Sequence, residues 1–496
     1  MVEKRGVRLS PILLMRSFFL LLLILLTACQ ASGSGDTLPL LPPATPGPTL
    51  SPSPTRPVYA PGELVDYIAQ DGDTLPALAA RFNTTVREIL QANPFIPEQA
   101  TTLPPGMPMK IPIYYLPLWG TTFHSLPDIA FVYGPGDRGF NTSAFVTAQR
   151  GWLKDFRDYV ASSWKDGAGM VEQVATDFSI SPRLLLAILE YQSQALSNPE
   201  LPQTGGYTLG YRDPYHRGVY LQLVWAANTL NHGYYGWRSG KLTEFELPDG
   251  RLYRPDPWQN AASVAVQYYF SRLFAGEVFE QAIGPNGLLA TYRRLFGDPW
   301  AEKAVLIPGN LTQPPLRLPF PAGRRWAYTG GPHTGWGTGF PWAALDFAPP
   351  ATQRGCMTPA AQDFVVAMAD GVIVRSGANG LILDLDGDGD ERTGWTIFYL
   401  HLATEGRAAV GQTVHAGEKI GYPSCESGRA TGTHVHIARK YNGEWILADG
   451  PLGFNLEGWV AQNGPKPYQG RLQRGFDIVI ASEYAEGFSQ ILAGAP

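Results

Sequence analysis

The chain reads GRATGTHVHI at residues 428–437, and these residues are the strongest indication of how its C-terminal part folds. Polar and apolar residues alternate at its end, as they do in a half-buried β-strand. The side chains of a strand point alternately to its two faces. His434 and His436 therefore share one face, and the apolar residues beside them share the other. The stretch predicts a strand that presents two imidazoles side by side.

Three more residues of the kinds that bind metal ions lie upstream, in or beside predicted strands. His401 closes a strand-like run, and alternation places Tyr399 and His401 on one face. Asp346 lies in an apolar run, where a buried carboxylate needs a partner because desolvating an unpaired charge is costly. His333 lies in a glycine-rich stretch. Five of the eight histidines of the chain fall in this C-terminal part.

Short apolar runs bounded by Gly or Asp turns surround these residues. They predict further strands at 365–368, 371–374, 381–383 and 396–399. We therefore expect residues 313–480 to form a mainly β domain with an antiparallel sheet, followed by a tail at 481–496. The run 476–480 is one more strand-like segment that can complete this sheet.

Taken together, the His…Asp pair, the His-Leu motif and the His-x-His motif resemble those of the lysostaphin/LytM-type metallopeptidases, which cut peptidoglycan peptides. The resemblance implies that His333, Asp346 and His436 hold one Zn²⁺ per chain. It implies that His401 and His434 are catalytic residues that do not bind the metal. Two imidazoles and one carboxylate suit a tetrahedral zinc site that keeps its fourth position open. Twelve residues separate His333 from Asp346, more than is usual in the family, and a glycine-rich insertion can loop out without moving either end.

Degenerate relatives with this fold bind and activate other wall hydrolases, and they usually lose one or more metal ligands. None of the five residues is lost here, which favours an active enzyme. His415 fits a turn between strands, and we interpret it as a surface residue.

An acidic loop offers a second candidate metal site. Asp384, Asp386, Asp388 and Asp390 alternate with Leu and Gly, like the first half of a Ca²⁺-binding loop. The Glu expected at position 12 of such a loop is replaced by Trp395. Both a Ca²⁺ site and a solvated acidic turn fit this pattern.

The cysteine count leaves one pairing open. The chain has three Cys, and Cys356 and Cys425 remain if Cys29 is used elsewhere. In an oxidising compartment these two can form a disulfide, but the sequence does not report their separation.

Residues 125–312 are predicted to be mainly helical. The run 185–193 resembles the catalytic helix of lytic transglycosylases and lysozyme-like enzymes, whose general acid is a Glu. The matching residue here is Gln192, and an amide neither donates nor accepts a catalytic proton at neutral pH. Glu190 lies about 200° away around a helix. We expect a lysozyme-like domain that binds glycan without cutting it; an unrelated helical domain is the alternative.

Residues 63–114 predict a small α+β unit with the order strand, helix, helix, strand. Asp73 or Thr74 can cap the first helix. The Gly-Asp-Thr-Leu run at 72–75 and the later Leu-Pro-Pro-Gly and Ile-Pro motifs resemble a LysM module. LysM modules bind glycans that contain N-acetylglucosamine, so the resemblance implies peptidoglycan as a partner.

The N-terminus predicts export and lipid anchoring. Basic residues precede a short apolar core, as in a secretory signal, and Leu-Thr-Ala-Cys at 26–29 resembles a lipobox. The resemblance implies cleavage after residue 28 and a diacylglyceryl group on Cys29, which would anchor the chain to a bacterial membrane facing the wall. Residues 30–62 are a Pro-, Ser- and Thr-rich linker.

The whole chain is expected to be an extracytoplasmic lipoprotein that binds peptidoglycan and hydrolyses its peptide stems or cross-links. The net charge of −5 and the pI near 5.9 argue against a nucleic-acid partner. The alternatives are a non-catalytic wall-binding regulator and a lytic transglycosylase. Neither the peptide bond that is cut nor a protein activator is evident from the sequence.

Overall fold

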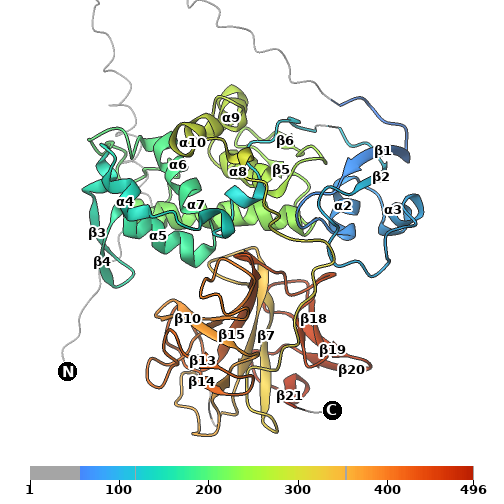
Figure 1. Cartoon of the computed structure of the whole chain (residues 1–496), viewed down its shortest axis with the longest axis vertical. Helices are drawn as coiled ribbons and strands as arrows, with labels where there is room; N and C mark the ends of the chain where they lie inside the picture. The colour runs from blue at the N-terminus through green and yellow to red at the C-terminus, as the bar shows by residue number, and fades with distance from the viewer. Residues whose placement is uncertain (1–55, 118, 352, 354, 495–496) are drawn as a thin grey trace, which may run out of the picture. The chain divides into compact units, whose positions relative to one another are not determined.

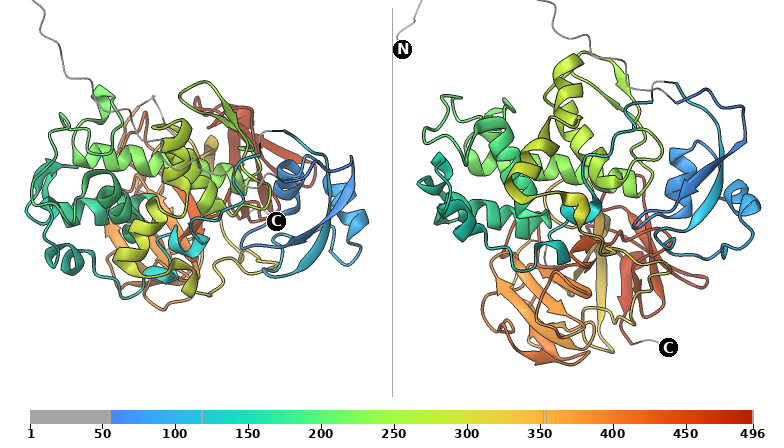
Figure 2. Two further views of the ribbon diagram at one scale, coloured as in Figure 1. Left: turned by 90° about the horizontal axis from the view of Figure 1, so that it is seen from above. Right: turned by 45° about the horizontal axis from the view of Figure 1, so that its top comes forward.

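The computed structural model describes residues 56–117, 119–351, 353 and 355–494, shown in Figure 1. Cys29, the signal segment and most of the linker lie outside these residues. The helices and strands of the described residues group into a small α+β unit, a helical region and a β-rich region, which Figure 2 shows in two further views. None of the helices in the described part is both long and apolar enough to cross a membrane.

The small α+β unit has the predicted order. It comprises β1 (Glu63–Ile68), α2 (Leu75–Arg81), α3 (Val86–Ala92) and β2 (Pro108–Ile113). The two strands pair antiparallel. Thr74 caps α2 by accepting a hydrogen bond from the Ala77 amide, and Thr85 caps α3 in a reciprocal pair with Glu88. Buried Leu78, Phe82 and other apolar side chains form its core.

The middle region is mainly helical, as expected, but the stretch 145–178 is not continuously so. The helices are α4 (Thr142–Thr147), α5 (Gly167–Phe178), α6 (Pro182–Ser193), α7 (Val219–Arg238), α8 (Ala261–Ser271), α9 (Gly276–Ile283) and α10 (Leu288–Phe296). Two hairpins interrupt them: β3 (Arg157–Val160) with β4 (Ser163–Asp166), and β5 (Phe245–Glu246) with β6 (Leu252–Tyr253). Short 3₁₀ turns fill the connections, at η1 (Asp128–Ala130), η2 (Pro135–Asp137), η3 (Trp152–Lys154), η4 (Pro214–His216) and η5 (Pro299–Ala301).

The start of α6 shows how tertiary contacts can override a local cap. Ser181 and Pro182 open this helix, a pair of residues that is common at helix starts, but the Ser181 hydroxyl makes no capping bond within it. That hydroxyl donates instead to the buried carboxylate of Asp137 at 3.0 Å. The Ser181 hydroxyl therefore binds a buried acceptor from another segment instead of capping its own helix.

A nine-stranded sheet forms the frame of the C-terminal region, and every pair in it is antiparallel. Its order is β13-β10-β11-β12-β15-β8-β7-β21, with β16 also paired to β15. The strands are β7 (Arg325–Thr334), β8 (Trp342–Ala348), β10 (Gly371–Gly377), β11 (Gly380–Asp384), β12 (Trp395–Leu400), β13 (Thr413–Val414), β15 (Val435–Tyr441), β16 (Glu444–Trp445) and β21 (Gln490–Leu492).

Two smaller sheets complete this region. One pairs β9 (Val365–Val366) with β14 (Lys419–Gly421), and the other joins β17 (Asn455–Leu456), β18 (Trp459–Asn463), β19 (Gly470–Arg474) and β20 (Asp477–Ile480). The run 476–480 therefore does not extend the large sheet. The 3₁₀ turn η6 (Gly487–Ser489) leads instead to β21, and β21, in the segment described above as a tail, pairs with β7.

Each face of the large sheet contributes to a different core. Val435, Ile437 and Tyr399 pack into a core that belongs to the C-terminal region alone. Ala438 and Phe398, one residue along their strands, pack into the same core as the helices of the middle region. The face of β15 that carries His436 is thus the face that meets the middle region.

A buried arginine joins the three regions. Arg238, at the end of α7, pairs with Asp128 at 3.0 Å and with Glu444 of β16 at 2.9 Å. It also donates to the backbone oxygen of Asp71 in the α+β unit. Tyr234 donates to the same Glu444 carboxylate at 2.9 Å.

Candidate metal centre and active site

Three strands bring His333, Asp346 and His436 together, although 103 positions separate the first from the last. Asp346 of β8 lies directly opposite His436 of β15 in the antiparallel register. β7 and β8 form a hairpin whose register shifts twice before His333, and these shifts bring His333 beside Asp346. The glycine-rich insertion forms the loop that connects β7 to β8. Because these two strands pair, the insertion leaves His333 and Asp346 close together in space.

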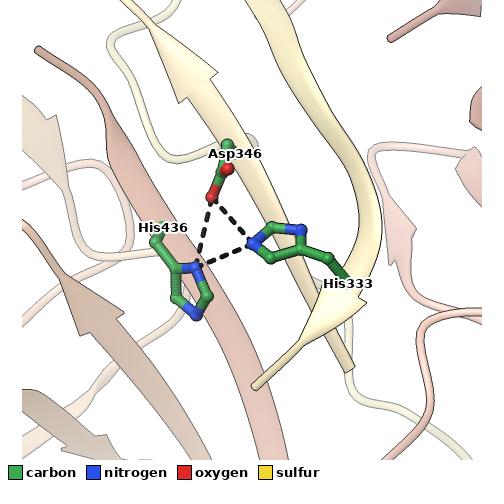
Figure 3. A group of neighbouring side chains, drawn as sticks. All are labelled: His333, Asp346 and His436. Atoms are coloured by element: carbon green, nitrogen blue, oxygen red, sulfur yellow. Dashed lines mark hydrogen bonds and ion pairs between the residues drawn. The ribbon is translucent and has the colours of Figure 1, made fainter. Parts of the chain in front are cut away.

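The three ligand atoms form a nearly regular triangle, shown in Figure 3. His333 Nε2 lies 3.0 Å from His436 Nδ1, and Asp346 Oδ1 lies 3.3 Å and 3.2 Å from these two nitrogens. All three residues are buried. A tetrahedral zinc ion with bonds of about 2.0–2.1 Å has ligand atoms about 3.3 Å apart. The triangle therefore has the size of one face of a zinc coordination tetrahedron.

Backbone carbonyls orient both metal-facing imidazoles. His333 Nδ1 lies 2.7 Å from the Gly331 oxygen, and His436 Nε2 lies 3.1 Å from the Gly335 oxygen. A carbonyl oxygen only accepts, so each of these ring nitrogens carries the proton. The opposite nitrogens then direct lone pairs at each other and at the Asp346 carboxylate. The two lone pairs and the carboxylate repel one another unless a cation lies between them.

The surroundings of Asp346 fit the same cation. Its Oδ1 is buried and receives no hydrogen bond from any described residue. A Cβ atom on Gly330 would lie 2.4 Å from the Asp346 carboxylate, so only glycine leaves room for this side chain. The donor set, its spacing and the unpaired oxygen all fit zinc.

The two further histidines lie beside this triangle. The rings of His401 and His434 are 4.4 Å apart, and His434 Nε2 lies 3.8 Å from Asp346 Oδ1. His401 Nδ1 lies 3.0 Å from the Glu426 oxygen, and His434 Nδ1 lies 2.8 Å from the Gly432 oxygen. Both rings thus donate from Nδ1 and keep Nε2 as a proton acceptor. Burial, then the neighbouring imidazoles, lowers the pKa of His401 to about 4, so this ring is neutral at neutral pH.

The predicted shared face of Tyr399 and His401 is wrong. Tyr399 is buried in the core on the opposite side of the sheet, where its hydroxyl accepts a hydrogen bond from the Met368 amide. His401 follows the last residue of β12 and has a left-handed backbone, with φ of 60°. This conformation ends the alternation and turns the imidazole toward His434.

Sequence reasoning missed one aromatic residue at the site. The Tyr468 ring stacks on the His333 imidazole at 4.1 Å and 23°, and about half of its side chain is exposed. Tyr468 lies between β18 and β19, in a loop without periodicity or motif, so no local signal marks it. It contributes a hydroxyl-bearing wall beside the metal centre.

A disulfide between Cys356 and Cys425 borders the same site, which answers the question that the sequence left open. Their Cα atoms are 5.8 Å apart. Cys425 adjoins Glu426, whose backbone oxygen orients His401. The residues on either side of Cys356 hydrogen-bond Thr433, next to His434. The crosslink thus ties together the two segments that support His401 and His434.

The acidic loop between β11 and β12 gathers three of its four predicted ligands. Asp384, Asp386 and Asp388 offer carboxylate oxygens that lie within 4.8 Å of one another. Burial and the neighbouring Asp386 raise the pKa of Asp384 to about 6. Asp390 instead pairs with Arg392 at 2.7 Å and with Arg138 at 3.3 Å. The Ca²⁺ site stays a prediction, which calcium titration of the chain and of its Asp386→Asn variant will test.

His415 lies on the surface, as predicted, and takes no part in the metal triangle. In the middle region, both polar atoms of the Gln192 amide are engaged: Nε2 donates to the Leu209 oxygen at 2.8 Å, and Tyr269 donates to Oε1 at 2.5 Å. Glu190 is buried and accepts hydrogen bonds from the Leu196 amide and from Arg294. Neither side chain is placed as a free general acid, and the lysozyme-like interpretation of this region stays a prediction.

Comparison with protein families identifies three matching regions. Residues 67–112 match the LysM domain, residues 124–310 match the N-terminal domain of LasA, and residues 352–447 match peptidase family M23. The last match includes His401, His434 and His436 and begins after His333 and Asp346.

Protease LasA of Pseudomonas aeruginosa, in two strains, is 28% identical to this chain over 350 residues, which are 66% of this chain and 75% of the relative. Among solved structures, the M23 metalloprotease pseudoalterin from the deep sea is 24% identical, with 34% of this chain and 96% of that chain covered and a TM-score of 0.29. A zinc-containing peptidase from Vibrio cholerae is 21% identical, with 29% and 41% covered and a TM-score of 0.21. Three regions of the chain are thus similar, in order, to a LysM domain, the LasA N-terminal domain and a domain of peptidase family M23, and these family names serve below as labels for them.

Proposed function

We propose that this protein is an extracytoplasmic zinc metallopeptidase that binds peptidoglycan and hydrolyses its peptide stems or cross-links. The observation that carries the proposal is the triangle of His333, Asp346 and His436, whose two lone pairs and carboxylate converge at the spacing of a zinc site. The LysM and M23 matches support the wall as the substrate and peptide hydrolysis as the reaction. The LasA relative is itself named as a protease.

In this proposal His333, Asp346 and His436 hold zinc, and His401 and His434 act on the substrate. When bound, zinc supplies a Lewis acid that polarises the scissile carbonyl and makes the attacking water more acidic. The Nε2 atoms of His401 and His434 remain as proton acceptors beside the triangle. One of them can take the proton of the water, and in its protonated form either can donate to the leaving amine.

The other parts of the chain hold the enzyme at the wall. The LysM domain binds the glycan strands, and a diacylglyceryl group on Cys29, which is outside the described residues, anchors the chain in a bacterial membrane. Two acyl chains suffice for stable anchoring. Mass spectrometry of the membrane-extracted protein should find a lipidated Cys29 as its first residue.

The function is tested by measuring zinc content and peptide release from purified sacculi on the same preparations. We expect about one zinc per chain and new amino termini in the sacculi. His436→Ala should lose both, whereas the matched surface variant His415→Ala should keep both. Bound zinc without new amino termini would favour a regulator that has kept the metal site. Anhydro-muropeptides in place of free peptides would favour a lytic transglycosylase.

A further inference from the structure

A cavity of about 600 Å³ is lined mainly by the LasA N-terminal domain, and none of the metal triangle residues lines it. This volume is within the range of about 300–1,000 Å³ that is usual for ligand sites. One face of α7 lines it at every third or fourth position, and α8 contributes Tyr268 and Ser271. The lining side chains used below are Tyr211, Trp225, His232, Glu246, Tyr268 and Arg272.

Two stacked ring pairs form much of the wall. Tyr211 lies flat on Trp225, with ring centres 4.2 Å apart and 6° between the planes. His232 lies on Tyr268 at 5.0 Å and 20°. Stacking fixes the orientation of each ring, so the aromatic side chains of the cavity lose little conformational entropy when a ligand binds.

No described residue hydrogen-bonds the hydroxyls of Tyr211 and Tyr268, the Trp225 indole N–H or the His232 ring nitrogens. Arg272 and Glu246 place one positive and one negative side chain at the wall, so the cavity has no excess of either charge. Apolar ring faces beside unpaired donors and acceptors suit a ligand that has apolar C–H faces and many hydroxyls.

We propose that this cavity is a second glycan site, which takes a short stretch of N-acetylated amino-sugar strand. The inference rests on the proposed function, because that function supplies peptidoglycan as the polymer. Only one carboxylate, Glu246, lines the cavity, whereas most glycoside hydrolases use two. The role proposed for the cavity is therefore to bind glycan.

The cavity also contacts the hairpin that carries a zinc ligand. Thr338 and Gly339, from the insertion between His333 and Asp346, form part of its wall. The Thr338 amide donates to the side-chain oxygen of Asn228 on α7 at 2.7 Å. A glycan bound in the cavity would therefore touch the same hairpin as the peptide-cutting site, and the strand that carries the substrate peptide would be held beside it.

Hydrogen–deuterium exchange of the full chain tests this proposal, because it reports on the LysM domain and on the cavity separately. The probe is a tetramer of N-acetylglucosamine, with maltotetraose as the comparison sugar. We expect slower exchange in α7 and α8 as well as in residues 63–113. Tyr268→Ala should weaken the cavity's affinity about tenfold, since one stacked aromatic contact contributes up to this factor. The LysM protection should not change.

Two further variants separate loss of binding from loss of folding. Thr338→Trp blocks the cavity from an exposed loop and should also remove the protection of α7 and α8. Tyr215→Ala removes an aromatic ring that is 85% exposed and outside the cavity, and it should leave the protection intact. Protection confined to residues 63–113, or cavity protection that survives both Tyr268→Ala and Thr338→Trp, would overturn the proposal. Protection of α7 and α8 by a free stem peptide instead of the sugar would overturn it too.

The outcome is independent of peptide hydrolysis. His436→Ala should lose peptide release and keep the protection of α7 and α8. Cavity protection in a wild-type chain that releases no peptide would support the glycan site and overturn the proposed peptidase. Peptide release without cavity protection would support the proposed peptidase and overturn the glycan site.

Discussion

Arg238 Nε donates to the Glu444 carboxylate at 2.9 Å, and both side chains are buried where the LasA N-terminal domain meets the M23 domain. Truncating Glu444 would leave Arg238 with Asp128 as its remaining carboxylate partner. Removing one partner of a buried pair costs about 3–5 kcal/mol. We expect Glu444→Ala to destabilise the chain by roughly 3 kcal/mol, measured by urea unfolding.

The matched control is Glu444→Gln, which keeps hydrogen-bonding capacity toward Arg238 and Tyr234 and should lose less stability. Arg251→Ala, which breaks an exposed pair with Asp249, should change the free energy of unfolding by about 0.5 kcal/mol or less. An equally small effect of Glu444→Ala would show that the Arg238 cluster does not hold the two domains together.

Removing zinc should destabilise the M23 domain. Without a cation, the lone pairs of His333 and His436 and the Asp346 carboxylate face one another at 3.0–3.3 Å. A ligand that binds only the folded state adds roughly 4 kcal/mol at a thousandfold excess over its Kd. Chelation should therefore lower the melting temperature, and zinc should restore it. A chelator effect of equal size in His436→Ala would locate the metal elsewhere.

His401→Ala and His434→Ala should separate metal binding from catalysis. Neither residue belongs to the triangle, so each variant should keep about one zinc per chain. Each should lose peptide release by about 10²- to 10⁴-fold, the usual contribution of a general acid or base. Zinc loss from either variant, measured by atomic absorption, would instead assign that histidine to the metal.

Much of the M23 domain could be predicted because its signals are local. The alternation around His436 marks β15, and turn residues on either side mark β10, β11 and β12. A run of apolar residues also predicts that Asp346 is buried. Each of these inferences needs only the period of a strand and the cost of an unpaired buried charge.

The parts that escaped prediction depend on contacts between distant segments. The neighbours of Tyr468 give no hint that its ring stacks on His333. β21 pairs with β7 across more than 150 positions. The left-handed backbone at His401 reverses a face that alternation alone assigns wrongly. Periodicity reports which residues are buried, but not which other segment covers them.

The stability of the chain should depend on pH through Asp71. Burial and the nearby Asp128 raise the pKa of Asp71 to about 6. Because the pKa is higher in the folded state than in the unfolded state, folding binds protons. The Asp71 carboxyl makes its whole contribution to stability below the unfolded pKa of about 4. This contribution is lost as the pH rises through the folded pKa of about 6.

Asp71→Asn should therefore be more stable than the wild type above pH 7, by roughly 1 kcal/mol after allowance for solvent screening. The difference should vanish well below the unfolded pKa of about 4, where the wild-type carboxyl binds its proton in both states. Thermal unfolding across this range measures it. A constant difference at every pH would mean that the substitution acts through packing and not through titration.

The Cys356–Cys425 disulfide should affect catalysis as well as stability. It closes a loop of 69 positions, and a crosslink of this length stabilises a fold by about 4 kcal/mol in the loop-entropy model. The bonded segments also carry the backbone groups that support His401 and His434. The double variant Cys356→Ser with Cys425→Ser should thus melt at a lower temperature and release peptides more slowly. It should still bind zinc, because the triangle is held by β7, β8 and β15. Cys425→Ser alone breaks the same bond and should match the double variant. Unchanged peptide release in a variant with a lowered melting temperature would confine the crosslink to a structural role.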